Sequence, residues 1–176
     1  MYNGITRDIE QELLGCLRYL GIKFYAYNVL AGGILSGKHK YEDYDNKTIQ
    51  KGRFYGDSPW AQFYRHRFWS KSKFEGIDIL KDALQKAYDG KVTLVEASCR
   101  WIMHHSMLGK EDAVILGAST IKHFNSNMAA LKDKEPLKKE VVDAFDQAWK
   151  LSRGACPSYV GNHMTIKYLK PINGGQ

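Results

Sequence analysis

Two stretches of this chain have the composition of β-strands, and they stand roughly 85 residues apart. The first is the apolar and aromatic run Ile22–Tyr27, and the second is Ala113–Leu116, which Gly117 ends. Short apolar runs of this kind predict buried strands. Two strands alone do not form a stable sheet, and parallel strands need neighbours and cover on both faces. We therefore expect either further strands between the two runs or a larger fold of which this chain forms a part.

Helices are predicted for most of the remaining sequence. Apolar residues recur at helical spacing over 9–20, where Thr6 is the expected N-cap and Gly21 the expected stop. Because the first strand follows that glycine at once, the order helix, glycine, strand is typical of an α/β fold. Further helices are expected over 77–87, from a Thr93–Glu96 capping box to about Met107, from Ser119 or Thr120 onwards, and over 137–151.

The region 39–72 differs from the rest, since it mixes nine aromatic residues with charges, glycines and one proline. This composition predicts a long loop with a short helix from Trp60 to Trp69. Loops of such length in compact domains usually serve as functional lids or are partly disordered. Both interpretations stay open.

A glycine-rich loop with a lysine follows the first strand. Gly32, Gly33 and Gly37 allow backbone N–H groups to approach a ligand closely, and Lys38 adds a positive charge. The loop is therefore a predicted cradle for phosphate. The glycine and lysine spacing also satisfies most of a P-loop pattern, but His39 stands where magnesium coordination requires Ser or Thr. A glycine turn without a ligand is the remaining alternative.

A second predicted anion site follows the second strand. After Gly117, the hydroxyl residues Ser119 and Thr120 open a helix, and helix N-termini bind anions through their unpaired N–H groups and partial positive charge. Lys122 and His123 fall in the first turn, where a cation costs about 0.3–1 kcal/mol. That placement is reasonable if an anion binds there. The alternative is two solvated side chains on an exposed turn.

The composition is that of a globular protein, with 44% hydrophobic and 26% charged residues. The net charge of +7 could serve nucleic acid or a small anionic ligand, and the dispersed lysines favour the ligand. No apolar run reaches membrane-spanning length and no signal peptide is recognisable, so a cytoplasmic protein without membrane or nucleic-acid partners is expected. Cys16, Cys99 and Cys156 form no C-x-x-C pair, which predicts reduced thiols rather than disulfides or zinc.

The sequence offers no convincing metal site and no catalytic constellation. His104 and His105 are adjacent, and adjacent helical side chains point about 100° apart, so they cannot chelate one ion together. No Ser/His/Asp set or carboxylate pair has a persuasive spacing. The residues by themselves therefore indicate neither a metal site nor a catalytic set.

Several sequence blocks, in fixed order, resemble the C-terminal half of an aldo-keto reductase of the aflatoxin-aldehyde reductase branch. They cover about residues 1 to 160 and include Met1-Tyr-Asn-Gly-Ile-Thr-Arg, Phe24-Tyr-Ala-Tyr-Asn, Ala31-Gly-Gly-Ile-Leu-Ser-Gly-Lys38, Gly52-Arg-Phe-Tyr-Gly, Arg100-Trp-Ile-Met-His-His-Ser, Val114-Ile-Leu-Gly and Val141-Val-Asp-Ala-Phe-Asp-Gln-Ala-Trp.

This resemblance implies a (β/α)8 TIM barrel that reduces aldehydes and ketones with NADPH and without a metal. The site of such a barrel lies at the carboxyl ends of its strands. Residues 28–38 would lie along the pyrophosphate and ribose, Arg53 would add a phosphate contact, and 117–127 would hold the adenosine 2′-phosphate. The residues so assigned are Asn28, Leu30, Ala31, Gly32, Gly33, Leu35, Ser36, Gly37, Lys38, Arg53, Gly117, Ser119, Thr120, His123 and Asn127.

The family's catalytic tyrosine, aspartate, lysine and histidine come from the first half of the barrel, and the resemblance places none of them in this chain. The chain is therefore expected to be the C-terminal part of an incomplete, helix-rich barrel, with residues 1–161 as its domain and 162–176 as a divergent, flexible tail. The two strands would be the sixth and eighth of the barrel, with the seventh near the end of the aromatic region or displaced. Gly161 stands where the branch has a substrate-binding arginine.

Three functional hypotheses follow from these observations. The first is part of an NADPH-dependent aldehyde reductase, inactive by itself. The second is a non-enzymatic binding or regulatory subunit. It would form a homo- or heterodimer by pairing the exposed edge of its barrel with a partner. The third is a P-loop nucleotide hydrolase.

Overall fold

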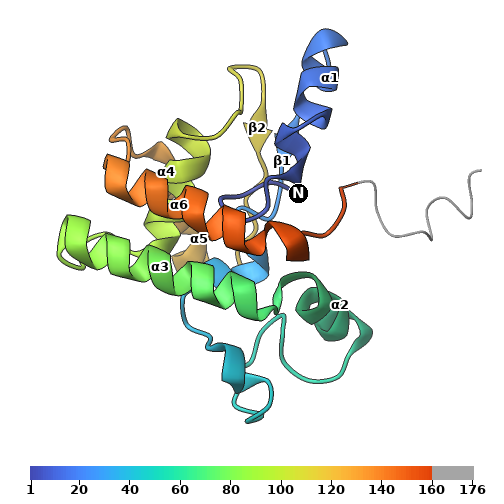
Figure 1. Cartoon of the computed structure of the whole chain (residues 1–176), viewed down its shortest axis with the longest axis vertical. Helices are drawn as coiled ribbons and strands as arrows, with labels where there is room; N and C mark the ends of the chain where they lie inside the picture. Colours follow the sequence, from blue (N-terminus) through green and yellow to red (C-terminus); the bar gives the residue numbers. More distant parts are fainter. Residues whose placement is uncertain (160–176) are drawn as a thin grey trace, which may run out of the picture.

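The computed structural model describes residues 1–159, and helices dominate it (Figure 1). The expected tail and Gly161 lie outside the described residues. Short 3-10 helices carry the label η. The elements are η1 (Asp8–Glu10), α1 (Leu13–Tyr19), β1 (Tyr25–Ala26), η2 (Ala31–Ser36), η3 (Tyr41–Asp43), α2 (Pro59–Phe68), α3 (Lys71–Tyr88), α4 (Leu94–His104), β2 (Ala113–Val114), α5 (Ile121–Lys132), α6 (Lys139–Ser152) and η4 (Arg153–Ala155).

The two strands pair directly and in parallel, with Tyr25 opposite Ala113. The backbone N–H of Ala113 donates to the carbonyl of Phe24 at 3.0 Å, and that of Ile115 donates to the carbonyl of Ala26 at 2.7 Å. Hydrogen bonds of this length leave no room for another strand. Of the two alternatives, the one that places further strands between the two runs is therefore wrong, because within residues 1–159 the aromatic region holds η3, loops and α2 instead.

The prediction that both strands are buried is also wrong. Ala26 is fully buried, but Tyr25 is 57% exposed, Tyr27 40% and Ile115 53%. Alternate residues of a strand point to opposite faces, and the parallel register places these three side chains on one face of the sheet. That face, called the open sheet face below, faces solvent in the described part of the chain.

The core lies among the helices and on the covered face of the sheet. Helices α3 and α6 pack along each other, with α4 behind them in Figure 1. Gly76 permits this close approach, because a Cβ at that position would lie 3.0 Å from the Cβ of Ala148. The fully buried rings of Tyr2, Trp101 and Phe145 join these helices to the N-terminal segment.

Local helix signals were mostly reliable predictors. The reciprocal capping box of Thr93 and Glu96 opens α4 as predicted, and Gly21 ends α1 with φ +65°. The predicted cap at Thr6 is wrong, because the backbone of Thr6 bonds back to Asn3 and its hydroxyl is buried without a hydrogen-bond partner. The first predicted helix is consequently divided into η1 and α1. Among residues 1–159, no helix has the length and apolar character needed to cross a bilayer.

Candidate phosphate-binding site

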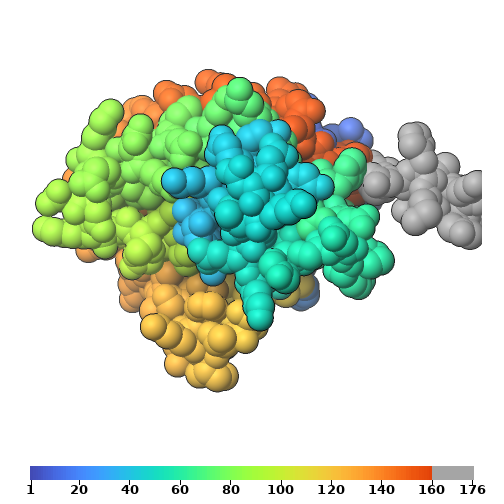
Figure 2. Space-filling view, turned by 90° about the horizontal axis from the view of Figure 1, so that it is seen from below, coloured from blue at the N-terminus to red at the C-terminus, as the bar shows by residue number. Residues whose placement is uncertain are grey.

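Both predicted anion-binding segments follow the carboxyl ends of the paired strands. The glycine loop with η2 comes after β1, and Gly117 and α5 come after β2. Because neighbouring parallel strands end at the same edge of a sheet, the two segments lie at one end of the fold. Figure 2 shows the start of α5, in gold, beside the blue and cyan residues that follow β1. The structure therefore brings the two segments together.

The glycine loop has a backbone that other residues adopt only with strain. Gly32 and Gly37 have φ +72°, and Gly33 has φ +114°. A Cβ on Gly33 would meet no atom within 4 Å, so its backbone is open to an approaching ligand. Asn28 and Ala31 also have positive φ, which fixes the turn where the chain leaves β1.

The structure does not support the P-loop alternative. In a P-loop the lysine is followed at once by a helix. Here the chain is extended at Lys40, and only the single-turn η3 follows. His39 is buried, with its ring 5.5 Å from that of Phe54 and 5.4 Å from that of Trp69. Its side chain is thus part of an aromatic cluster and is not available as a magnesium ligand.

Only some of the predicted side chains in the glycine loop can reach a ligand. Ala31 and Leu35 are fully buried, so they could contribute backbone groups alone. Lys38 is exposed at the end of the loop. The hydroxyl oxygen of Ser36 is buried and has no hydrogen-bond partner among the described residues. An orphaned polar atom of this kind is costly unless a ligand or water satisfies it.

The second segment has the predicted helix N-terminus. The hydroxyl of Thr120 accepts a hydrogen bond from the backbone N–H of His123 at 3.1 Å, and Ser119 Oγ lies 3.1 Å from the Nδ1 atom of the same histidine. The first turn of α5 contains no acidic residue. Asn127 is only 6% exposed, so the assignment of its side chain to a ligand has little geometric support.

Arg53 lies between the two segments. Its Nη2 atom would be 3.5 Å from a Cβ on Gly117. Its Nη1 atom donates a hydrogen bond of 3.2 Å to the hydroxyl of Tyr64, whose ring packs against Gly32. Tyr64 was not among the residues predicted from sequence, because no local spacing links it to either segment. Through its contacts with Gly32 and Arg53, Tyr64 connects the glycine loop to the segment after β2.

These residues fit a ligand with more than one phosphate group. Within residues 1–159, Lys38, Arg53 and Lys122 have no carboxylate within ion-pair distance. Lys38 follows the open glycine backbone, Arg53 lies beside Gly117, and Lys122 belongs to the first turn of α5. Arrangements of this type bind phosphate.

A cavity of about 520 Å³ lies on another face of α2 and contains no residue predicted to bind the ligand. Tyr41, Tyr44 and Trp69 are among its walls. Arg65 is buried there, and its Nη1 atom donates to the carbonyls of Phe54 and Gly56. A binding site for a small molecule needs convergent polar groups that fix the ligand, and the glycine loop, Arg53 and the start of α5 offer more free donors for phosphate than this cavity does.

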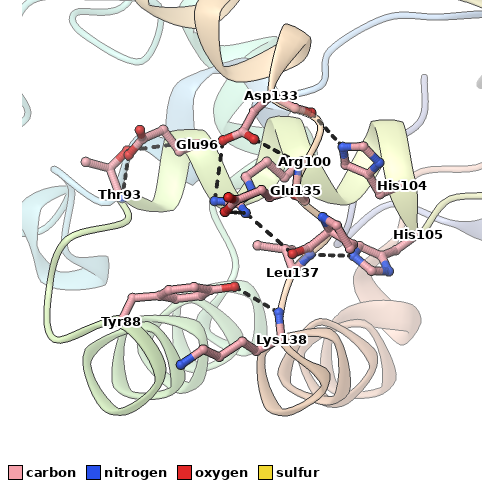
Figure 3. Close-up of polar contacts among 11 residues, drawn as sticks. Tyr88, Thr93, Glu96, Arg100, His104, His105, Asp133, Glu135, Leu137 and Lys138 are labelled. Atoms are coloured by element: carbon pink, nitrogen blue, oxygen red, sulfur yellow. Dashed lines mark hydrogen bonds and ion pairs between the residues drawn. The ribbon is translucent and has the colours of Figure 1, made fainter.

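His104 and His105 have structural roles (Figure 3). The Nε2 atom of His104 lies 2.7 Å from the carbonyl of Asp133, and the Nε2 atom of His105 accepts the backbone N–H of Leu137 at 2.8 Å. Burial and the charges of its neighbours lower the pKa of His105, which favours the neutral acceptor form. Arg100 adds a 2.8 Å bond to the carbonyl of Glu135. This network holds the connection between α5 and α6 against α4.

No group of three or more His, Cys, Asp or Glu side chains within residues 1–159 could hold a metal ion.

Comparison with known proteins finds one protein family and several relatives. A family model described as the aldo/keto reductase family matches residues 1–150. The chain is 50% identical over 162 residues to "Aflatoxin B1 aldehyde reductase member 2" of Homo sapiens, covering 90% of this chain and 44% of that protein. It is 49% identical to the human "Aldo-keto reductase family 7 member A3", with 90% and 48% covered. It is also 49% identical to "Aflatoxin B1 aldehyde reductase member 2" of Mus musculus, with 90% and 43% covered. The chain thus spans less than half the length of these relatives.

Proposed function

This chain belongs to the aldo/keto reductase family, and we propose that it forms the cofactor-binding part of an NADPH-dependent aldehyde reductase with a (β/α)8 barrel. The observation that carries the proposal is the meeting of the glycine loop, Arg53 and the start of α5 at one end of the sheet. Relatives named as aflatoxin B1 aldehyde reductases support an aldehyde as substrate.

Different residues of this chain would bind different parts of the cofactor. The open backbone around Gly33, the orphaned hydroxyl of Ser36 and the exposed Lys38 would hold the pyrophosphate. The capped start of α5 at Thr120, with Arg53 beside Gly117, would hold the 2′-phosphate of the adenosine. Separate contacts of this kind orient a long ligand, and orientation accelerates a bimolecular transfer.

When bound, NADPH supplies the hydride that reduces a carbonyl carbon. The carbonyl oxygen also needs a proton donor, and the family resemblance assigns none to this chain. We therefore propose that the catalytic tyrosine, aspartate, lysine and histidine lie in the portion of the barrel that the longer relatives possess. Three cysteines without disulfide bonds agree with a cytoplasmic location.

Fluorescence titration of the 176-residue chain with NADPH tests the binding function. We expect saturable quenching, weakened about tenfold or more by Lys38→Ala, because a charge-assisted hydrogen bond contributes about 1.5–3 kcal/mol. Lys71→Ala, an exposed lysine on α3, is the matched control and should change nothing. Absence of quenching at high micromolar NADPH would contradict the proposal. Aldehyde-dependent loss of NADPH absorbance by the purified chain would contradict the absence of a proton donor.

A second candidate is a non-enzymatic binding subunit, favoured by one observation. Tyr25, Tyr27 and Ile115 form an open sheet face, and exposed apolar patches of this kind mark surfaces that another polypeptide covers. This candidate predicts specific association of the chain without any affinity for NADPH. The titration above therefore separates the two functions.

A further inference from the structure

Arg53 is an exposed arginine whose partner is aromatic rather than acidic. Its Nη1 atom donates to the hydroxyl oxygen of Tyr64 at 3.2 Å, and its guanidinium carbon lies 5.3 Å from the centre of the same ring. By contrast, Arg7, Arg18 and Arg100 each pair with a carboxylate. A neutral hydroxyl fixes the guanidinium without cancelling its charge. Arg53 is thus held in one place and stays available to an anion.

Tyr64 is itself held by the glycine loop and by its own helix. Its ring stacks on that of Phe68 at 6.0 Å and meets that of Phe54 edge-on at 6.2 Å. A Cβ on Gly32 would lie 2.9 Å from Cδ1 of Tyr64, so only a glycine allows the ring to lie there. The position of the hydroxyl is consequently set by the loop that we assign to the pyrophosphate.

The other end of the guanidinium faces the second segment. The Nη2 atom of Arg53 would be 3.5 Å from a Cβ on Gly117, three residues before the Thr120 cap of α5. The first turn of that helix has no acidic residue. An anion at this position would meet both the guanidinium and the positive end of the helix.

We propose that Tyr64 is a positioning residue of the cofactor site, which holds Arg53 beside Gly117 so that the guanidinium binds the 2′-phosphate of NADPH. The inference rests on the proposed function and adds a residue that touches neither phosphate. Arginine suits this role because its planar fork binds phosphate through two hydrogen bonds at once. Tyr64 acts by restricting the orientations of that fork.

Isothermal titration calorimetry of the 176-residue chain with NADPH and with NADH tests this inference. NADH lacks the 2′-phosphate. Tyr64→Phe removes only the hydroxyl and keeps the ring that packs on Gly32 and Phe68. We expect it to weaken NADPH binding about threefold to tenfold and to leave NADH binding unchanged. Tyr44→Phe is the matched control, because that ring also lies under an arginine, Arg65, at 5.2 Å; it should change neither affinity.

A double-mutant cycle shows whether Tyr64 acts through Arg53. In an Arg53→Ala background, Tyr64→Phe should have no further effect on NADPH affinity. An effect that persists in that background, or equal losses for NADPH and NADH, would overturn the inference and leave the proposed function intact. If the wild-type chain binds neither nucleotide, the proposed function fails and the inference fails with it.

Discussion

Lys73 is an uncommon side chain for the interior of a protein, since it is only 1% exposed. Its ammonium donates to the carbonyl of Arg67 at 3.1 Å and to that of Ala155 at 2.6 Å. It therefore joins the last turn of α2 to η4 through the start of α3. Within residues 1–159 no carboxylate pairs with it, and burial lowers its pKa from 10.5 to about 8.

This depressed pKa predicts that stability rises with pH in an alkaline window. Below pH 8 the ammonium is charged in both states, so the cost of burying it is fully present. Between pH 8 and 10.5 the folded chain releases the proton while the unfolded chain keeps it, which favours folding. Relative to Lys73→Met, the free energy of unfolding should increase by about 3 kcal/mol from pH 7.5 to pH 10.5.

Urea denaturation of both proteins across this pH range measures the difference. Cys156 is electrostatically coupled to Lys73, so the comparison is made in a Cys156→Ala background. Lys71→Met, at an exposed position of the same helix, is the control and should follow the parent protein. A constant difference between the parent and Lys73→Met at all pH values would contradict the depressed pKa.

Helix α4 begins with a reciprocal capping box. The hydroxyl of Thr93 accepts the backbone N–H of Glu96 at 3.2 Å, and the Glu96 carboxylate accepts the backbone N–H of Thr93 at 2.8 Å. This reciprocal pair satisfies donors that a helix N-terminus otherwise leaves unpaired. Because Arg100 of α4 also bonds to the connection from α5 to α6, the cap stabilises the helix against which that connection packs.

Removal of this cap should have a modest and specific effect on stability. Thr93 is exposed, so Thr93→Ala creates no cavity and should lower the free energy of unfolding by about 1 kcal/mol. For a chain of this length that corresponds to a fall in Tm of roughly 2–4 °C, measured by circular dichroism. Thr93→Ser keeps the hydroxyl and should retain most of the stability. Equal losses in the two variants would show that the hydroxyl is not responsible.

At the scale of the whole molecule, the open sheet face is an apolar surface that residues 1–159 leave uncovered. Tyr25 and Ile115 are more than half exposed on it, although tyrosine and isoleucine at such positions usually pack. A parallel sheet of two strands needs cover on both faces, and the described residues provide it on one. This face is where we expect another polypeptide to bind.

The chain alone should therefore self-associate through this face. The chain's sedimentation coefficient should rise with protein concentration as it associates, and the double variant Tyr25→Lys and Ile115→Lys should reduce this rise. Charges on the face oppose its burial, and sedimentation velocity measures the effect. Tyr55→Lys with Leu151→Lys introduces the same charge at exposed apolar positions outside the sheet. If the control pair reduces association as much, net charge rather than the open sheet face is the cause.

The sequence alone determined most local structure. Helix limits at Gly21, at the Thr93–Glu96 box and at Thr120 were predictable because caps act between residues a few positions apart. The glycines of the loop likewise indicated a backbone that a ligand can approach, although the positive φ of Asn28 and Ala31 was visible only in the structure. Membership of the family was likewise readable from ordered blocks of sequence.

Only the tertiary structure decided which distant segments of the chain lie next to each other. The direct pairing of β1 with β2, the exposure of Tyr25, and the placing of Arg53 between Tyr64 and Gly117 join parts of the chain that are far apart in sequence. The burial of Lys73 also depends on contacts between segments that are far apart in sequence. Such contacts depend on how all the helices pack together, because no periodicity or cap within one segment records which distant segment will cover it.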